Sequence, residues 1–394
     1  MKILHTSDWH LGRNFHGASL LDDQQRMVTE IIELAVGRGV DLVVIAGDIY
    51  DRAIPPAGAV DLFDEALAEL HRSGLAVVAV AGNHDSAVRV SVNDRVLTAA
   101  GVTVRGDVAR ATEPMVFEPG DGGGPVAVYP VPYLEPTVVA ATIDVPTEGR
   151  RPSHDEATRA LCDLVRDDLA LRAESHPGIR SVLVAHTFVT NSSPSDSERD
   201  LSVGNVESVG VGAFAGFDYV ALGHLHRPQE PEPGRVVYSG SPLPYSFSEQ
   251  DHTKSVRLVE LRPDGSVAIE EVPITSGRRL ATIEGRLAEL LEDPALTSLE
   301  EAWVRVYLTD RDLPSQAMAR IRDRFPHAVE LRHRPPTTAA VVDGADTTRI
   351  GPSVSPLDLV RRFWLRYEER ELDPDQEQIV VEALEVTMVG EGAR

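Results

Sequence analysis

The sequence predicts an α/β protein whose main domain contains layered β-sheets covered by helices. Two patterns support this: short β-rich runs alternate with amphipathic helical segments up to about residue 270, and several later runs follow one another without helices between them. The second pattern favours a mixed sheet, or two stacked sheets, over a purely parallel one. The chain has 394 residues, which is more than a single hydrophobic core usually accommodates, so we expect one or two smaller domains beside the main one.

The helices of the main domain are recognised by apolar residues at helix spacing. Met27, Ile31 and Leu34 mark the first helix, before the run DLVVIAGD. The second helix precedes LAVVAVAGNHD, and the third spans about residues 155–174. The closely spaced runs that follow are RVVYSGSPLP, SVRLVEL and SVAIEEV.

Composition changes along the chain divide it into four parts. We expect a main domain at residues 1–275 and, after the linker-like VPITSGRR, a small α/β capping domain at residues 276–335. A linker rich in Pro, Thr, Asp and Gly then covers residues 336–354. Two capped helices close the chain at residues 355–394, the first beginning at Ser355-Pro356 and the second at Asp373.

The overall composition is that of a soluble, cytoplasmic enzyme. Apolar residues make up 42% and charged residues 25%. We see no secretory signal and no apolar run long enough to span a membrane. The single Cys162 removes cysteine from any metal site.

A net charge of −24 argues against a broad basic face for nucleic acid. It does not exclude DNA as a substrate, because metal cations bound in a local cleft supply positive charge of their own.

Polar side chains follow five of the predicted strands where each strand ends. The carboxyl ends of strands are the places where α/β sheets assemble sites, so we expect these residues to converge. The candidates are Asp8, His10, Asp48, Asp51, Asn83, His84, His186, His224 and His226.

The residue types suit two divalent cations. Asp, Asn and His without a thiolate fit manganese, iron or zinc. A shared carboxylate holds two metals about 3.5–4 Å apart, the separation that phosphoryl displacement requires. Asp48 is the expected bridge, and the preceding Gly47 would let the backbone turn tightly at the sheet edge.

Taken singly, the motifs allow simpler interpretations. DWH is equally an ordinary loop, and GNHD is equally an Asx turn at a strand end. GHLH is stronger, because two histidines flanking one residue point to the same side of an extended segment. The eight remaining histidines lie outside the strand-end pattern, and we expect structural or solvated roles for them.

Together, the five motifs resemble the signature of calcineurin-like metallophosphoesterases, over roughly residues 1–270. The flanking sequences narrow the resemblance to the SbcD family, the nuclease subunits of bacterial SbcCD DNA-repair complexes. These sequences are HTSDWHLG, AGDIYDRAIPP, GNHDSAVRVS and YSGSPLPYSFSE.

The resemblance implies two-metal phosphodiester hydrolysis, with manganese as the expected metal. One cation would be held by Asp8, His10, Asp48 and His226, and the second by Asp48, Asn83, His186 and His224. His84 would protonate the leaving oxygen, and Asp51 would accept a hydrogen bond from His84 and orient its ring. The implied activity is a double-strand DNA exonuclease and a hairpin or structure-selective endonuclease that serves DNA repair, recombination and replication.

The resemblance also implies partners. They are an SbcC-type ATPase, double-stranded DNA at ends and hairpins, and a second copy of the chain, which forms a homodimer within a heterotetramer. No membrane partner is expected. The penultimate helix has an apolar stripe that is either core or a docking face for the ATPase. Its residues are Val360, Phe363, Trp364 and Tyr367. Arg13, Asn14 and Arg89 are candidate DNA contacts, with solvated loop roles as the alternative.

Two other functions remain open. The phosphatase branch of the superfamily carries Asp where Asp51 stands, so a metallophosphoesterase acting on small phosphodiesters, nucleotides or phosphoproteins is the alternative enzyme. Asp85 favours the nuclease branch. A catalytically idle scaffold for the ATPase is the non-enzymatic alternative, and the complete ligand set with His84 argues against it.

Overall fold

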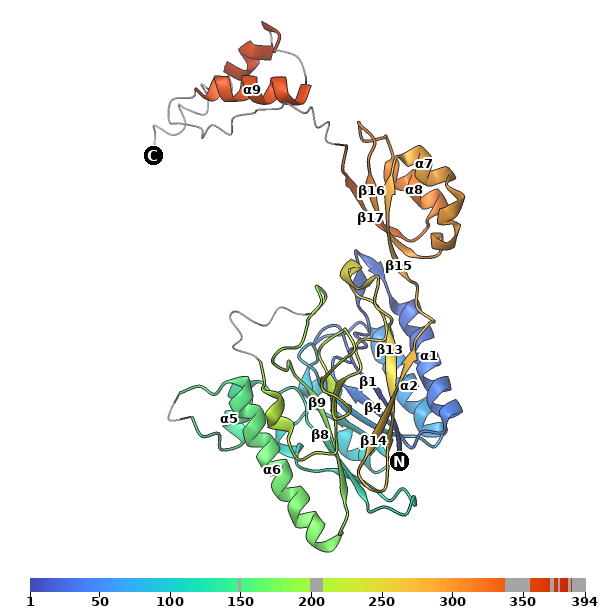
Figure 1. Ribbon diagram of the computed structural model, residues 1–394, viewed down its shortest axis with the longest axis vertical. Coiled ribbons are helices and arrows are strands. Elements are labelled where there is room, and N and C mark those ends of the chain that lie inside the picture. Colours follow the sequence, from blue (N-terminus) through green and yellow to red (C-terminus); the bar gives the residue numbers. More distant parts are fainter. Residues whose placement is uncertain are drawn as a thin grey trace. The chain divides into compact units, whose positions relative to one another are not determined.

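The computed structural model describes residues 1–147, 150–198, 208–336, 355–368, 372–374, 376–381 and 384. Contacts within the chain group it into two units, residues 1–336 and residues 337–394. Figure 1 shows the elements of both. The two units are described separately below.

The first six-stranded sheet contains three of the five ligand-bearing strands. Four of its strands are parallel, and two antiparallel strands extend one edge, in the order β14-β13-β1-β4-β5-β6. The strands are β1 Lys2–Thr6, β4 Leu42–Ala46, β5 Ala76–Val80, β6 Val102–Arg105, β13 Ser255–Leu261 and β14 Val267–Pro273.

The second six-stranded sheet contains the other two ligand-bearing strands, β9 and β10, at its centre. Its order is β11-β12-β10-β9-β8-β7, with antiparallel strands at both edges. The strands are β7 Met115–Phe117, β8 Val126–Pro130, β9 Arg180–His186, β10 Tyr219–Gly223, β11 Gln229–Glu232 and β12 Val236–Tyr238. The prediction of mixed, stacked sheets is confirmed.

The two sheets share an apolar core between their inner faces. All five residues of β4 are buried, and the alternation of side chains divides them between two cores. Val44 belongs to the core that also contains Val128 and Val184 of the second sheet. Val43 and Ile45 face the opposite way, into the core beneath the helices. A strand buried on both faces explains why the sequence there is a continuous apolar run.

Helices cover the outer face of each sheet (Figure 1). Residues of α1 and α2 pack with the first sheet, and residues of α6 pack with the second. The predicted third helix is α6, which begins with a capping box between Ser153 and Glu156. The helices of this part are α1 Leu21–Arg38, α2 Ala57–Arg72, α3 Ala87–Val90, α4 Asp94–Thr98, α5 Pro136–Thr142 and α6 His154–Ser175. A hairpin, β2 Asn14–Phe15 and β3 Ala18–Ser19, leads into α1.

A small parallel sheet with two helices follows within the same unit. Its order is β15-β16-β17, and it has its own apolar core with α7 and α8. The Trp303 indole donates to Asp23 of α1 at 3.2 Å. The division into domains at residue 275 stays a prediction. The elements are β15 Leu280–Gly285, α7 Leu287–Glu292, β16 Trp303–Leu308, α8 Ala317–Arg324 and β17 Ala328–His333.

The second unit contains α9, Pro356–Glu368. Ser355 Oγ accepts from the Asp358 backbone N–H at 3.1 Å, which is the predicted cap. Phe363 of the apolar stripe is exposed, whereas Val360 and Trp364 are half-buried. The side chain of Tyr367 and nearly all of the predicted linker lie outside the described residues. Across the described parts of both units, no helix combines the length and the apolar character needed to cross a membrane.

Candidate metal centre

The five predicted strand ends meet at one place, although they come from two sheets. β1, β4 and β5 end in the loops that carry Asp8, Asp48 and Asn83, while β9 and β10 end at His186 and just before His224. Parallel strands of both sheets point their carboxyl ends toward the same edge of the layered structure. The ligand-bearing loops therefore face one another across the interface between the sheets.

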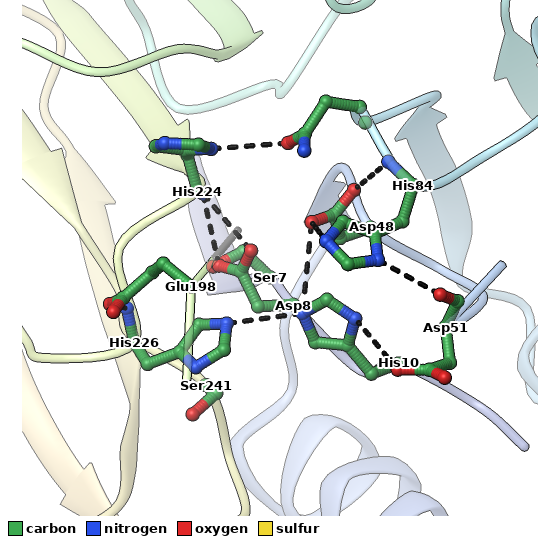
Figure 2. A network of polar contacts seen from close by, with 12 residues as sticks. Ser7, Asp8, His10, Asp48, Asp51, His84, Glu198, His224, His226 and Ser241 are labelled. Carbon is green, nitrogen blue, oxygen red and sulfur yellow. Dashed lines mark hydrogen bonds and ion pairs between the residues drawn. The ribbon is translucent and has the colours of Figure 1, made fainter. Parts of the chain in front are cut away.

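One potential metal site is formed by Asp8, His10 and His226, all of them buried. His10 Nε2 and His226 Nε2 are 3.0 Å apart, and Figure 2 shows these two nitrogens pointing toward each other. His10 Nε2 is also 3.6 Å from Asp48 Oδ2. Two imidazole nitrogens at this separation share at most one proton, so their lone pairs converge on a position suited to a cation.

Two further groups of potential ligands both contain Asp48: one is Asp8, Asp48 and His186, and the other is His10, Asp48 and His84. His186 Nε2 lies 3.5 Å from Asp48 Oδ2 and 2.9 Å from Asn83 Oδ1. The same Asn83 oxygen is 3.1 Å from His224 Nδ1. The seven residues predicted as ligands thus form one continuous cluster, and the roles assigned to them stay predictions.

The backbone is strained where these ligands stand. Seven non-glycine residues have positive φ among the described residues, and four of them are predicted ligands: Asp8, His10, Asp48 and His224. Positive φ is unfavourable for residues with a Cβ and persists where surrounding contacts enforce it. Asp8 N donates to Gly47 O at 3.0 Å, and His10 N donates to Asp48 O at 2.9 Å, so the first two loops hold each other.

Two glycines let these loops approach closely. A Cβ on Gly47 would lie 2.2 Å from His186 Nδ1, and a Cβ on Gly82 would lie 2.1 Å from Asp48 Oδ1. Only glycine fits at such a separation, because the neighbouring atoms belong to buried side chains. The Gly-Asp and Gly-Asn-His motifs are therefore packing requirements as well as sources of ligands.

His84 lies beside the cluster and is accessible to solvent. Its side chain is 15% exposed, and its Nε2 is 4.0 Å from Asp48 Oδ2. Its Nδ1 donates to the backbone carbonyl of Asp51 at 2.8 Å (Figure 2). The resemblance implied a hydrogen bond from His84 to Asp51, and here its acceptor is the main-chain oxygen. The Asp51 carboxylate lies 3.8 Å from His10 Nδ1 and 3.5 Å from the Arg13 guanidinium.

Burial and mutual charge set the pKa values of the cluster. Burial raises the pKa of Asp8 to about 6 and lowers that of His224 to about 3. Burial alone would lower the pKa of His186, but the Asp48 carboxylate raises it to about 9. Asp48 itself stays ionised, because His186 and His10 outweigh its burial and hold its pKa well below the usual range.

The donor set fits divalent cations. Asp8 and Asp48 bring two carboxylates into a buried space, which is unfavourable unless positive charge accompanies them. His186 Nδ1 donates to the Ala46 carbonyl at 2.9 Å, which leaves Nε2 free to bind a metal. His10 and His224 have lowered pKa values, and a neutral imidazole is the form that ligates metals.

Two residues that support the site, Asp85 and Glu198, were not among the predicted site residues. The Asp85 carboxylate accepts from the backbone N–H groups of Ile49, Tyr50 and Gly82, at 2.8–3.0 Å, and so joins the loops after β4 and β5. Glu198 accepts from the His226 N–H at 2.7 Å. Asp85 is part of the GNHD motif, so the sequence could have indicated its role. Glu198 lies in a loop without a recognisable motif, so the sequence could not.

The candidate DNA contacts differ in accessibility. Arg13 is largely buried, because its guanidinium donates to Ser197 O at 3.1 Å and stacks on Tyr245. Asn14 and Arg89 are exposed. Arg13 is therefore engaged with the metal-site loops, while the other two are open to a ligand.

Two other histidines have structural surroundings. His5 is buried beneath the site, where its Nε2 donates to Leu222 O at 3.1 Å and its Nδ1 accepts from Tyr219 OH at 2.8 Å. His16 lies 3.9 Å from Glu330 of the small sheet and contacts Phe15 and Phe247. Neither takes part in the cluster.

Comparison with known proteins agrees with the motifs. The family model described as Calcineurin-like phosphoesterase matches residues 1–228. A second model, SbcD_C, described as the Type 5 capsule protein repressor C-terminal domain, matches residues 276–368.

A curated relative extends the similarity along the chain. The SbcD component of the nuclease SbcCD from Staphylococcus saprophyticus is 29% identical over 335 residues, which cover 85% of each chain. Among solved structures, a dimetal phosphatase from Danio rerio is 13% identical and covers 70% of this chain and 96% of its own, with a TM-score of 0.43. The protein TT1561 of Thermus thermophilus is 15% identical and covers 70% of this chain and 99% of its own, with a TM-score of 0.39.

Proposed function

This chain belongs to the calcineurin-like phosphoesterase family and is a metal-dependent phosphodiesterase, and from that premise we propose that it is the DNA nuclease subunit of an SbcCD-type complex. One observation carries the catalytic part: three overlapping groups of potential metal ligands meet here, two sharing Asp8 and two sharing Asp48, and one of them includes the partly exposed His84. The substrate part is supported by the similarity to a nuclease subunit over 85% of the chain.

In this proposal the seven clustered residues hold two divalent cations, with manganese as the expected metal. Asp8, His10, Asp48 and His226 would hold one, and Asp48, Asn83, His186 and His224 the other. Bound cations would supply the positive charge that a phosphodiester needs for in-line displacement. The absence of thiolates, with oxygen and imidazole donors together, supports a metal of manganese type.

His84 is the proposed proton donor to the leaving oxygen. Its Nδ1–H is held by the Asp51 carbonyl, so its Nε2 is the nitrogen that faces the cluster. A side chain that donates a proton to the leaving oxygen must contact the substrate. The His84 side chain is 15% exposed, which is consistent with such a contact.

The proposed substrate is double-stranded DNA at ends and hairpins. The chain has a net charge of −24, so we expect weak intrinsic DNA affinity and dependence on an SbcC-type ATPase. The single Cys162 supports a cytoplasmic location.

The test is digestion of linear and hairpin DNA with manganese, with and without that ATPase. We expect both substrates to be cut and the ATPase to raise the rate. Rapid hydrolysis of a small diester such as bis-p-nitrophenyl phosphate, with no cleavage of either DNA under any condition, would instead support the alternative of a small-substrate phosphoesterase. Asp51-Arg52, a pair shared with the phosphatase branch, is the observation that keeps this alternative open.

We also propose that the nuclease forms a homodimer. The segment of α3 and α4 exposes three valines at four-residue spacing: Val88, Val92 and Val96 have exposed fractions of 79%, 70% and 75%. Exposed apolar side chains that lie close together are a feature of protein–protein contact surfaces. A second copy would bury this valine row against its own equivalent, as a two-fold interface requires.

A further inference from the structure

A closed ring of hydrogen bonds stands behind His226, on the side away from the cluster. The Nδ1 of His226 and Oγ of Ser197 are 2.5 Å apart, and Ser197 Oγ also bonds to the Glu249 carboxylate. Glu249 forms an ion pair with Lys254, whose Nζ donates back to the His226 carbonyl at 3.0 Å. The ring thus begins and ends on the same histidine.

The direction of each bond in the ring follows from elementary chemistry. Glu249 is ionised beside Lys254 and can only accept, so the Ser197 hydroxyl must donate to it. The hydroxyl has one hydrogen, so its oxygen accepts from His226 Nδ1–H. A neutral imidazole with its proton on Nδ1 has its lone pair on Nε2, the nitrogen 3.0 Å from His10 Nε2.

The Glu249–Lys254 ion pair is buried, and the free-energy cost of removing both charges from water calls for a reason besides fold stability. Ser197, Glu249 and Lys254 are all buried. Burying an ion pair is often no more stabilising than apolar packing of the same volume. The other hydrogen bonds of the pair join it to neighbouring loops: Lys254 also donates to Ser241 Oγ at 2.9 Å, and Glu249 also accepts from Ser195 Oγ and from the Tyr245 N–H, both at 3.3 Å.

We propose that Glu249, anchored by Lys254, is a positioning residue that acts through Ser197 to keep the His226 proton on Nδ1 and the Nε2 lone pair directed at the cation site. The inference rests on the proposed function, because it takes His226 as a metal ligand. Partners of this kind, bonded to the far nitrogen of a ligating histidine, change metal affinity by about 10–100-fold when removed.

The chain offers a matched set of variants for the test. Ser197→Ala removes the acceptor of His226 Nδ1–H and leaves the Glu249–Lys254 pair in place, while Ser197→Thr keeps a hydroxyl. Ser195→Ala is the control, because Ser195 lies on the same loop and bonds to Ser197 Oγ at 3.1 Å and to the Glu249 carboxylate at 3.3 Å but makes no contact with the imidazole. Mn²⁺ alone is titrated into the metal-stripped full-length chain, with free Mn²⁺ followed by electron paramagnetic resonance.

We expect Ser197→Ala to weaken Mn²⁺ binding at one site by about tenfold or more, with Ser197→Thr and Ser195→Ala close to the parent chain. Glu249→Gln should weaken the same site, and the double variant with Ser197→Ala should lose no more than the stronger single change, because both act along one path. The melting temperature of the metal-free chain should fall no further for Ser197→Ala than for Ser195→Ala.

Two results would overturn the proposal. Equal Mn²⁺ affinity in Ser197→Ala and the parent chain would show that the ring does not position His226. Equal weakening by Ser197→Ala and Ser195→Ala would show that loop packing is responsible. If the parent chain itself binds no Mn²⁺, the proposed metal site fails first, and the two failures are thereby distinguished.

Discussion

The Nδ1 atoms of His84 and His186 each donate to a main-chain carbonyl, that of Asp51 and that of Ala46. In both rings this leaves Nε2 facing Asp48. The rings differ in accessibility, because His186 is fully buried and His84 is not. At the scale of single residues, burial therefore separates a candidate ligand from a candidate proton donor when the hydrogen bonding of the two is alike.

This difference leads to a prediction for His84→Gln. The variant should lower DNA cleavage by about 100-fold or more, because glutamine fills the same space but cannot carry a proton to the leaving oxygen. Its metal content, measured by elemental analysis, should equal that of the parent chain. Loss of metal in this variant would mean that His84 is itself a ligand.

His224→Ala is the counterpart at a predicted ligand. We expect it to lower the bound metal per chain in the same elemental analysis, because it removes an imidazole next to Asn83. Unchanged stoichiometry would remove His224 from the ligand set.

The pKa values predict how metal affinity depends on pH. In the metal-free chain His186 holds a proton up to a pKa of about 9, and Asp8 holds one up to a pKa of about 6. A cation must displace these protons, so Mn²⁺ affinity should rise with pH, and fall most steeply where both groups are protonated, below about pH 6. Calorimetric titration in buffers of different ionisation enthalpy measures the protons released. Affinity and proton release that stay constant with pH would contradict the assignment.

At the scale of elements, the site depends on how closely the loops after β4 and β5 approach. Asp85 accepts three N–H groups from the two loops, and Gly82 lies against Asp48 without room for a Cβ. The loops are thus joined by hydrogen bonds and by direct contact at the expected bridging carboxylate. A change of one methyl group at this contact must move Asp48.

We therefore predict that Gly82→Ala lowers the free energy of unfolding by about 1–3 kcal/mol and weakens metal binding, because the added Cβ displaces Asp48. Chemical denaturation and Mn²⁺ titration measure the two effects. Gly37→Ala in α1 is the matched control, since its Cβ would meet nothing within 4 Å. That change should be neutral or stabilise the chain by up to about 1 kcal/mol. A Gly82→Ala chain that binds Mn²⁺ as the parent does would show that the contact is dispensable.

At the scale of the whole molecule, the predictions concern surfaces that the catalytic cluster does not use. The valine row at Val88, Val92 and Val96 is the proposed dimer contact. Val92→Asp places a charge at its centre and should shift the chain from dimer to monomer in light scattering at matched concentration. Val116→Asp, at an exposed valine of edge strand β7, is the control and should leave the mass unchanged. A monomeric parent chain would refute the dimer.

The tail supplies the second prediction at this scale. Its residues 355–394 contain ten Asp or Glu and five Lys or Arg, so it should dock on protein rather than DNA. Deleting the tail should end co-purification with an SbcC-type ATPase and leave Mn²⁺ binding intact. Phe363→Ala should weaken the complex more than Leu365→Ala, because positions two apart on a helix point in nearly opposite directions. Retention of the ATPase after deletion would move the interface to another surface.

Local sequence pattern was enough to predict the fold class and the candidates for the site. Buried parallel strands are apolar runs, and the ligands follow those runs directly, so Asp8, Asp48 and His186 could be found without a structure. A small α/β module after residue 275 was expected in the same way, and strands β15, β16 and β17 lie there.

How the site is held became visible only in the folded chain. The fold brings strand ends from two separate sheets together, joins His84 to the main-chain carbonyl of Asp51, and places Glu249 and Lys254 behind His226. These contacts join residues far apart in sequence, and a side chain's partner across a core depends on packing that no local pattern encodes. The periodicity of apolar residues predicts which side of a helix or strand is buried. Which other element packs against that side is decided only when the sheets and helices pack together in the tertiary structure.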